Sequence, residues 1–181
     1  MSYTQIEASD ILYSSEEIMS NVQRLANERN TQYNGVDNLV IVGVLNGAFM
    51  FFSDLLKLLN VDCYVDFMSL KSYKNNKREE IKLIKGIDIE IDPNDMHILV
   101  IDDVVDSGHT MVWLQNYFNT LGVNSVRFCC LIDKPSGRDV DFSPDFSPDF
   151  IGMTMTTDDW IYGYGMDLDG KQRNLPMVMK L

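Results

Sequence analysis

The chain has 181 residues, 45% hydrophobic and 23% charged, which is typical of one globular domain with a full core. Its formal net charge of −12 disfavours nucleic-acid binding, because that binding rests on Lys and Arg neutralising phosphates. No apolar run approaches the roughly 20 residues of a membrane helix, and the N-terminus lacks the basic start and apolar stretch of a signal peptide. We therefore expect neither a nucleic-acid partner nor a membrane partner.

The first half of the chain alternates helix and strand signals. Residues 14–30 predict a helix, in which Ser14 and Glu17 form a capping-box pattern and Ile18, Val22, Leu25 and Ala26 share one face. Residues 38–48 predict a buried strand ending in a Gly-bearing loop, 49–59 a helix and 62–70 a strand. Residues 72–86 are polar and then β-branched, which suggests a mobile loop running into a short strand.

The second half continues this order and then loosens. Residues 96–102 predict a buried strand, 109–122 a helix closed by Gly122, and 125–133 another strand. Strands alternating with helices indicate a parallel sheet covered by helices. Residues 141–150, "DFSPDFSPDF", contain SPDF twice, a duplication that we expect to lengthen a surface loop. Residues 160–167 predict a short strand with a Gly-rich exit, and the tail after Gly170 is expected to pack back on the domain.

Three cysteines, Cys63, Cys129 and Cys130, bear on the redox compartment. The count is odd, and two of them are adjacent in a strand-like run. This usage predicts reduced, buried thiols in a cytoplasmic protein, and no Cys or His spacing resembles a zinc site.

The stretch "VIDDVVDSGHTM" (100–111) crowds carboxylates at a strand end. Asp102 and Asp103 stand at the carboxyl end of a predicted parallel strand, where α/β proteins bind ligands. Small residues over 106–110 let backbone N–H groups converge on an anion at the start of a helix. Amides beside carboxylates suit a phosphorylated sugar. The plainer alternative is that Asp106 caps the helix while the other two acids are solvated.

The same stretch resembles the 5-phosphoribosyl-1-pyrophosphate (PRPP) binding motif of type I phosphoribosyltransferases. "VGVLNGAFMFFSDLL" resembles the pyrophosphate loop of hypoxanthine-guanine phosphoribosyltransferases, and "LKSYKN" resembles their Ser-Tyr lid. "LIDKPSGR" and "DFIGMTMTTDDWIYGYGMDLDGKQRNLP" resemble their purine-binding hood. The likeness runs from about Leu39 to Pro176. It implies an α/β fold with a parallel-sheet core flanked by helices: one domain over 1–181, its core about 1–135 and a small hood mainly 136–181.

The resemblance implies a reaction and its partners. A 6-oxopurine base and PRPP would give the nucleoside 5′-monophosphate and pyrophosphate, with Mg²⁺ as cofactor and a homodimer or homotetramer as the default assembly. A xanthine-preferring transferase and a non-catalytic PRPP-sensing regulator stay open as alternatives. So does a metal phosphatase built at a strand end, although it would leave the hood segments unexplained.

The resemblance also assigns the PRPP site. Asp102 and Asp103 would face the ribose hydroxyls directly or through magnesium, and Asp106 would be the general base near purine N7. A non-proline cis peptide of the relatives falls, by position, at Leu45–Asn46. The PRPP-binding residues implied are Leu45, Asn46, Gly47, Asp102, Asp103, Asp106, Ser107, Gly108, His109, Thr110 and Arg173.

Four residues are implied at the base. Lys134 would donate to purine O6, Trp160 would stack on the ring, and the Ile161 main chain would meet its Watson–Crick edge. Asp167 would lie at the base and hold magnesium together with the two strand-end acids. Plainer alternatives treat Lys134 as a solvated loop cation and Trp160 as a core residue.

The lid is implied at Ser72 and Tyr73, which would close over the reaction centre and exclude water.

The chain departs from the family pattern at three positions. Asp102 stands where many relatives carry Glu, Asn46 where many carry Lys or Arg, and His109 where Lys is frequent. The last two changes remove fixed positive charge. We hypothesise that PRPP affinity here depends more strongly on magnesium.

Overall fold

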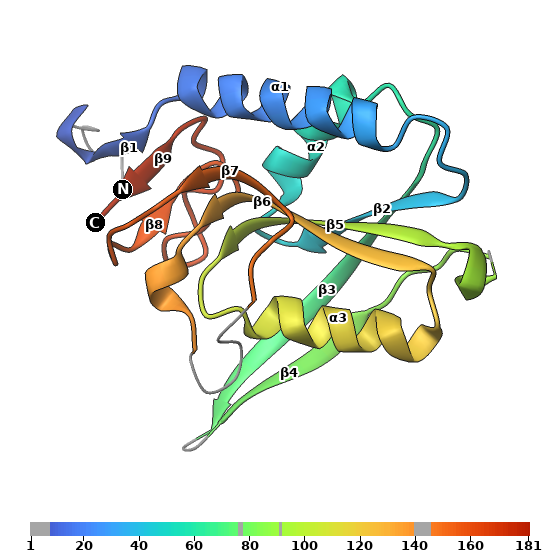
Figure 1. The fold of residues 1–181 in the computed structure, drawn as a ribbon. Coiled ribbons are helices and arrows are strands. Elements are labelled where there is room, and N and C mark those ends of the chain that lie inside the picture. The colour runs from blue at the N-terminus through green and yellow to red at the C-terminus, as the bar shows by residue number, and fades with distance from the viewer. Residues whose placement is uncertain (1–7, 76–77, 91, 140–145) are drawn as a thin grey trace.

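The computed structural model describes residues 8–75, 78–90, 92–139 and 146–181 (Figure 1). Its α-helices are α1 (Ser15–Gln32), α2 (Phe49–Leu58) and α3 (His109–Leu121). Short 3₁₀ helices are η1 (Ala8–Asp10), η2 (Pro93–Asp95) and η3 (Pro135–Gly137). The strands are β1 (Ile11–Tyr13), β2 (Leu39–Leu45), β3 (Tyr64–Asn75), β4 (Arg78–Lys85), β5 (His97–Val105), β6 (Ser125–Asp133), β7 (Phe150–Thr154), β8 (Ile161–Tyr162) and β9 (Val178–Lys180).

The larger sheet has six strands in the order β4-β3-β2-β5-β6-β7. Four neighbouring pairs run parallel, namely β3 with β2, β2 with β5, β5 with β6, and β6 with β7, which confirms the predicted parallel core. The edge strand β4 runs antiparallel to β3, so the sheet is mixed. β7 was not predicted, because its short apolar run follows directly on the duplicated tetrapeptide.

For residues 72–86, β4 confirms the predicted short strand, whereas the mobile loop predicted before it is wrong for the residues that the structure describes. β3 continues to Asn75 and pairs with β4 as an antiparallel hairpin, in which Ser72 lies opposite Ile81 and Tyr73 opposite Glu80. Ladder hydrogen bonds between backbone groups hold such a pair even where the side chains are polar. A polar segment therefore forms regular strand.

Both faces of the larger sheet are covered by helices (Figure 1). Side chains alternate along β2, so that Leu39 and Ile41 pack with buried residues of α1 and α2. Val40 and Val42 face the other way and pack with Met111, Leu114 and Phe118 of α3. The two apolar cores fix the position of the strand ends that carry the predicted site.

The ends of two helices follow the sequence signals. The Ser14 hydroxyl accepts from the Glu17 N–H at 3.2 Å, and the Glu17 carboxylate accepts from the Ser14 N–H at 2.8 Å, which confirms the capping box. α3 begins after Gly108 and is followed by Gly122 (φ 85° and 78°), so Gly122 closes the helix as predicted.

A small second sheet has the order β1-β9-β8. In this sheet the C-terminal strand β9 pairs with β8, the predicted strand near Trp160, and with β1 from the N-terminal part of the chain. Val178 and Met179 of β9 are buried, so the tail packs back on the domain as predicted. β7 lies within 136–181 but joins the larger sheet. The division into a core and a hood near residue 135 stays a proposal.

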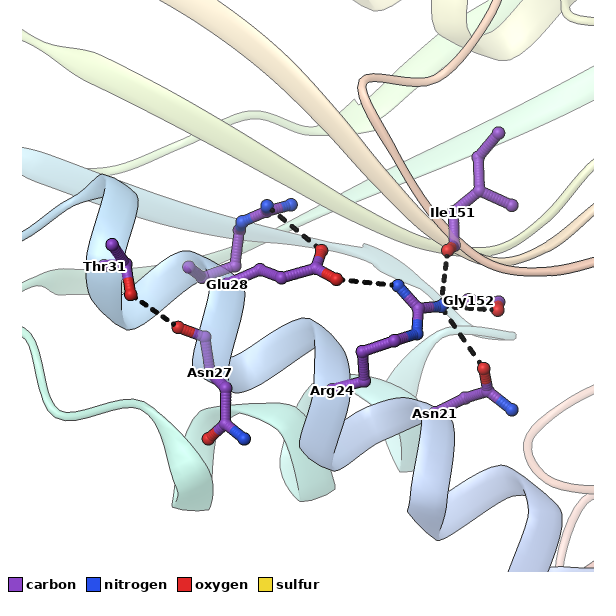
Figure 2. Close-up of polar contacts among 8 residues, drawn as sticks. Asn21, Arg24, Asn27, Glu28, Thr31, Ile151 and Gly152 are labelled. Atoms are coloured by element: carbon purple, nitrogen blue, oxygen red, sulfur yellow. Dashed lines mark hydrogen bonds and ion pairs between the residues drawn. The ribbon is translucent and has the colours of Figure 1, made fainter.

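Helix α1 holds the β7 edge of the larger sheet (Figure 2). The Arg24 guanidinium donates to the carbonyls of Ile151 and Gly152 at 2.9 and 2.7 Å, and the Glu28 carboxylate pairs with it at 3.0 Å. Arg24 thus occupies backbone acceptors of an edge strand, where free backbone groups can pair with another chain. Helix α1 thus contacts β7 through apolar side chains in the core and through the polar side chain of Arg24.

The second SPDF copy leads into β7. The Asp149 carboxylate accepts from the Phe128 N–H and pairs with Arg127, both at 2.8 Å, and Phe150 lies 3.2 Å beneath the Arg29 guanidinium. Most of the first copy lies outside the described residues, so the predicted lengthening of a surface loop stays a prediction.

All three cysteines are free, and Cys129 and Cys130 are buried. Neither α1 nor any other helix of the described ranges combines the length and apolar content that membrane crossing requires.

Candidate active site

A cavity of about 420 Å³ lies where the carboxyl ends of the parallel strands meet the hood segments. It brings together residues from β2, β5, the start of α3, the segment after β6 and the region around β8. The lining residues are Val44, Leu45, Gly47, Leu70, Ile81, Asp102, Asp103, Val104, Asp106, Thr110, Lys134, Trp160, Ile161, Met166, Asp167 and Arg173.

The two acids at the end of β5 lie deep in this cavity. Asp102 is 7% exposed, and its carboxylate accepts from the Asp103 N–H at 3.0 Å. Burial, and then the charge of Asp103, raise the pKa of Asp102 well above its ordinary value, and burial also raises the pKa of Asp103. The solvated alternative is therefore wrong for these acids, and a hydroxyl or cation would relieve their repulsion.

The loop after β2 approaches these acids closely. The Leu45–Asn46 peptide bond is cis, as the resemblance implies. A Cβ atom on Gly47 would overlap the Asp103 carboxylate, so any larger residue would displace that carboxylate. Gly47 lines the cavity, whereas Asn46 is exposed and does not.

The loop from Asp106 to Thr110, here called the phosphate loop, joins β5 to α3. Asp106 and Thr110 line the cavity, and Ser107, Gly108 and His109 lie between them without lining it. Gly108, rather than Asp106, occupies the N-cap position of α3. The capping alternative for Asp106 is wrong, and its side chain, 56% exposed, is available at the cavity.

Lys134 is not the solvated loop cation, and Trp160 is not the core residue, of the plainer alternatives. Lys134 is only 8% exposed, and its Nζ donates to the Asp159 carbonyl at 3.2 Å and lies 3.8 Å from the Asp106 carboxylate. Trp160 is 64% exposed although it lines the cavity. Lys134 is thus a buried cation beside the candidate base, and Trp160 offers a ring face instead of filling the core.

Asp167 and Arg173 form an ion pair at the hood side of the cavity. Arg173 donates to the Asp167 carboxylate and to the Gly165 carbonyl, each at 2.7 Å. The second Asp167 oxygen accepts from the Gly170 N–H at 2.9 Å. A Cβ on Gly165 (φ 102°) would overlap the Gly47 carbonyl, so the hood touches the loop after β2.

Some cavity residues were not predicted. Val44, Leu70, Ile81, Val104 and Met166 are apolar residues that the sequence pattern does not distinguish from core. For Ser72 and Tyr73 the structure describes the backbone, as part of β3, but not the side chains. Their role as a lid stays a prediction.

Comparison with known proteins agrees with this geometry. A family model described as "Phosphoribosyl transferase domain" matches residues 8–167. This match over most of the chain, together with the mostly parallel sheet flanked by helices, defines the class: a phosphoribosyltransferase of type I.

Individual relatives narrow the class. The hypoxanthine-guanine phosphoribosyltransferase of Bacillus subtilis is 37% identical over 170 residues, which cover 93% of this chain and 90% of that protein. A hypoxanthine-guanine phosphoribosyltransferase structure from Bacillus anthracis has a TM-score of 0.86 at 33% identity, covering 98% and 99% of the two chains. A hypoxanthine phosphoribosyltransferase structure from Staphylococcus aureus also has a TM-score of 0.86, at 29% identity, covering 99% and 96%. The chain belongs to the hypoxanthine-guanine phosphoribosyltransferase family.

Proposed function

We propose that this enzyme transfers the 5-phosphoribosyl group of PRPP to hypoxanthine and guanine, giving IMP or GMP and pyrophosphate in purine salvage. One observation carries the proposal: the same cavity holds the strand-end acids, the phosphate loop, a buried lysine and an exposed tryptophan face. Acids and amides suit a phosphorylated sugar, while a lysine and an aromatic ring suit an oxopurine.

At the sugar end, Asp102 and Asp103 accept hydrogen bonds from the ribose hydroxyls. Backbone amides of the phosphate loop, with the Ser107 and Thr110 hydroxyls, hold the 5′-phosphate at the start of α3. Gly47 and Arg173 face the pyrophosphate, and the Arg173 fork pairs with two of its oxygens. These contacts hold PRPP while positive charge develops at the anomeric carbon.

At the base end, Trp160 stacks on the purine, Lys134 donates to O6, and the Ile161 main chain with Asp167 reads the edge. Stacking accepts any purine, so discrimination rests on the hydrogen bonds. Asp106 takes the proton near N7 as the new bond forms. The Lys134 Nζ lies 3.8 Å from this carboxylate, so the proton acceptor and the proposed O6 donor stand side by side.

Magnesium fits the donor set as an ion that arrives with PRPP. Among the residues that the structure describes, no three acidic, His or Cys side chains gather closely enough to hold a metal. Mg²⁺ usually binds through one or two carboxylates together with substrate phosphates, and Asp102, Asp103 and Asp167 offer such oxygens. When bound, it would neutralise charge on the leaving pyrophosphate.

The test is a coupled assay with PRPP, Mg²⁺ and a panel of bases. We expect pyrophosphate release with hypoxanthine and guanine and little with adenine. Preference for xanthine would favour the xanthine alternative, and no release with any purine despite PRPP binding would favour a regulator.

The role of Asp106 has its own test. Asp106→Asn removes the proton acceptor, so we expect kcat to fall by about 10²-fold or more while PRPP binding is retained. Wild-type turnover in this variant would exclude Asp106 as the base.

We further propose a homodimer or homotetramer located in the cytoplasm. Light scattering of the purified protein would decide the oligomeric state.

A further inference from the structure

The segment that follows β6 contacts the phosphate loop through three successive residues. Gly137, Arg138 and Asp139, here called the brace, follow Lys134 and the start of η3. None of the three is among the site residues that the family resemblance implies. Each of the three contacts the end of β5 or the loop that carries Asp106.

Arg138 makes most of these contacts. One guanidinium nitrogen, Nη1, donates to the Val105 carbonyl at 2.9 Å and also to the Asp106 carbonyl. Nη2 donates to the Asp133 carboxylate, and both side chains of this ion pair are almost fully buried. The planar fork of Arg reaches the end of β5 and the end of β6 at once, which a lysine ammonium cannot do.

The neighbours of Arg138 add two contacts. The Asp139 N–H donates to the Ser107 carbonyl at 3.1 Å, and the Asp139 carboxylate lies 2.7 Å from His109 Nε2. A Cβ atom on Gly137 would overlap the Asp106 carboxylate. The missing side chain at Gly137 therefore leaves the space in which the candidate base lies.

These contacts set the direction of the loop amides. The carbonyls of Asp106 and Ser107 both turn toward the brace. Across a trans peptide bond the C=O and the following N–H point in opposite directions. The N–H groups of Ser107 and Gly108 are therefore turned away from the brace, and they belong to the amides assigned above to the 5′-phosphate.

We propose that the brace is a positioning element for the reaction: Arg138 and Asp139 orient the phosphate-loop amides toward PRPP, and Gly137 leaves Asp106 in place. This inference rests on the proposed function of the loop and of Asp106. None of the three residues need touch a substrate. Misplacing a bound group by about 1 Å costs up to about 10²-fold in rate, so indirect control of this kind is measurable.

The first test is Arg138→Lys, which keeps a positive charge beside buried Asp133 and loses the fork. We expect the KM for PRPP to rise about tenfold or more, with the KM for hypoxanthine changed less than about threefold. A purely structural role would reduce the folded fraction, which lowers kcat and leaves both KM values unchanged. The matched control is Arg127→Lys, in the exposed ion pair with Asp149 near the opposite end of β6, which should keep wild-type kinetics.

The second test is Gly137→Ala, whose methyl group displaces the exposed Asp106 carboxylate without removing a buried charge. We expect kcat to fall about tenfold at an unchanged unfolding temperature and a nearly unchanged KM for PRPP. A folded Arg138→Lys protein with the wild-type KM for PRPP would overturn the proposal. If that variant does not fold, wild-type kcat in Gly137→Ala overturns it instead.

The outcomes separate this inference from the proposed function. If Asp106→Asn loses turnover while Arg138→Lys and Gly137→Ala keep wild-type kinetic constants, the positioning role of the brace is refuted and the proposed function stands. Full turnover in Asp106→Asn refutes the assigned base itself, and with it the role given to Gly137.

Discussion

The Asp102–Asp103 pair lowers the stability of the ligand-free protein and at the same time favours PRPP binding. Asp102 is buried and Asp103 half-buried beside it, and the pair destabilises the ligand-free fold, because both carboxylates lose hydration that they have in the unfolded chain. The same arrangement provides acceptors that are already oriented when PRPP arrives.

This burial predicts a pH dependence of stability. Because burial raises the pKa of both acids, the folded protein retains protons that the unfolded chain releases above about pH 4. The free energy of unfolding contributed by the pair therefore decreases as the pH rises through the raised pKa values. Asp103→Asn removes one titrating group and the repulsion, so its Tm should fall less than that of wild type between about pH 5 and pH 8.

Ligand-free protein and circular dichroism suffice for this measurement. The control is Asp37→Asn, an exposed carboxyl whose loss should leave the wild-type slope. If Tm decreased equally with pH in Asp103→Asn and in wild type, the expectation would be contradicted.

At the scale of elements, α1 and β7 illustrate how a distant helix secures a sheet edge. β7 is short and pairs on one side with β6. Arg24 supplies donors to its carbonyls, and Arg29 covers Phe150 at the start of the strand. β7 therefore depends on α1 for much of its order.

We expect Arg24→Met to lower the free energy of unfolding without changing the enzyme's kinetic constants. Removing charged donors to two carbonyls should lower the free energy of unfolding by about 1–2 kcal/mol, while the KM values stay unchanged. Urea unfolding measures the change, with Gln23→Met on the exposed side of the same helix as control. Equal midpoints for the two variants would mean that Arg24 does not secure β7.

The elements also show what sequence could predict and what it could not. The start of α1 and the end of α3 were predictable, because Ser14, Glu17 and Gly122 act on backbone groups within a few residues. The pairing of β1 with β9 joins opposite ends of the chain, and β7 required knowledge of its partner strand.

The same limit applies within the site. The motif residues of β5 and the phosphate loop were predictable from their chemistry and from the family likeness. Whether Lys134 and Trp160 were buried or exposed depended on packing between distant segments. The role of Arg138 left no signal, because four of its five acceptors among the described residues are backbone carbonyls, and a carbonyl is present at every position.

The whole molecule is strongly acidic, with a formal net charge of −12, yet its substrate is a polyanion. Within the described chain, the cavity is lined by two cationic side chains, Lys134 and Arg173, and by four aspartates. The net charge of the protein therefore does not attract PRPP from a distance. Under the proposed function, PRPP binding rests on local amides, on Arg173 and on a cation that arrives with the substrate.

We accordingly expect a steep dependence of the PRPP KM on free Mg²⁺. Titration at constant ionic strength should show this KM falling as Mg²⁺ rises, because the ion replaces the fixed charge that Asn46 and His109 do not supply. Asn46→Lys restores one such charge and should flatten the dependence. A KM that is insensitive to Mg²⁺ above trace levels would contradict the hypothesis.

The tandem SPDF tetrapeptide has a consequence for how this loop can evolve. Phe142 precedes the first copy as Phe146 precedes the second, so excising residues 143–146 restores the same FSPDF junction before β7. The contacts of Asp149 and Phe150 belong to the copy that would remain. Replication slippage could thus add or remove one unit in a single event, leaving the gene free to vary the length of this crossover while the strand it feeds keeps its sequence.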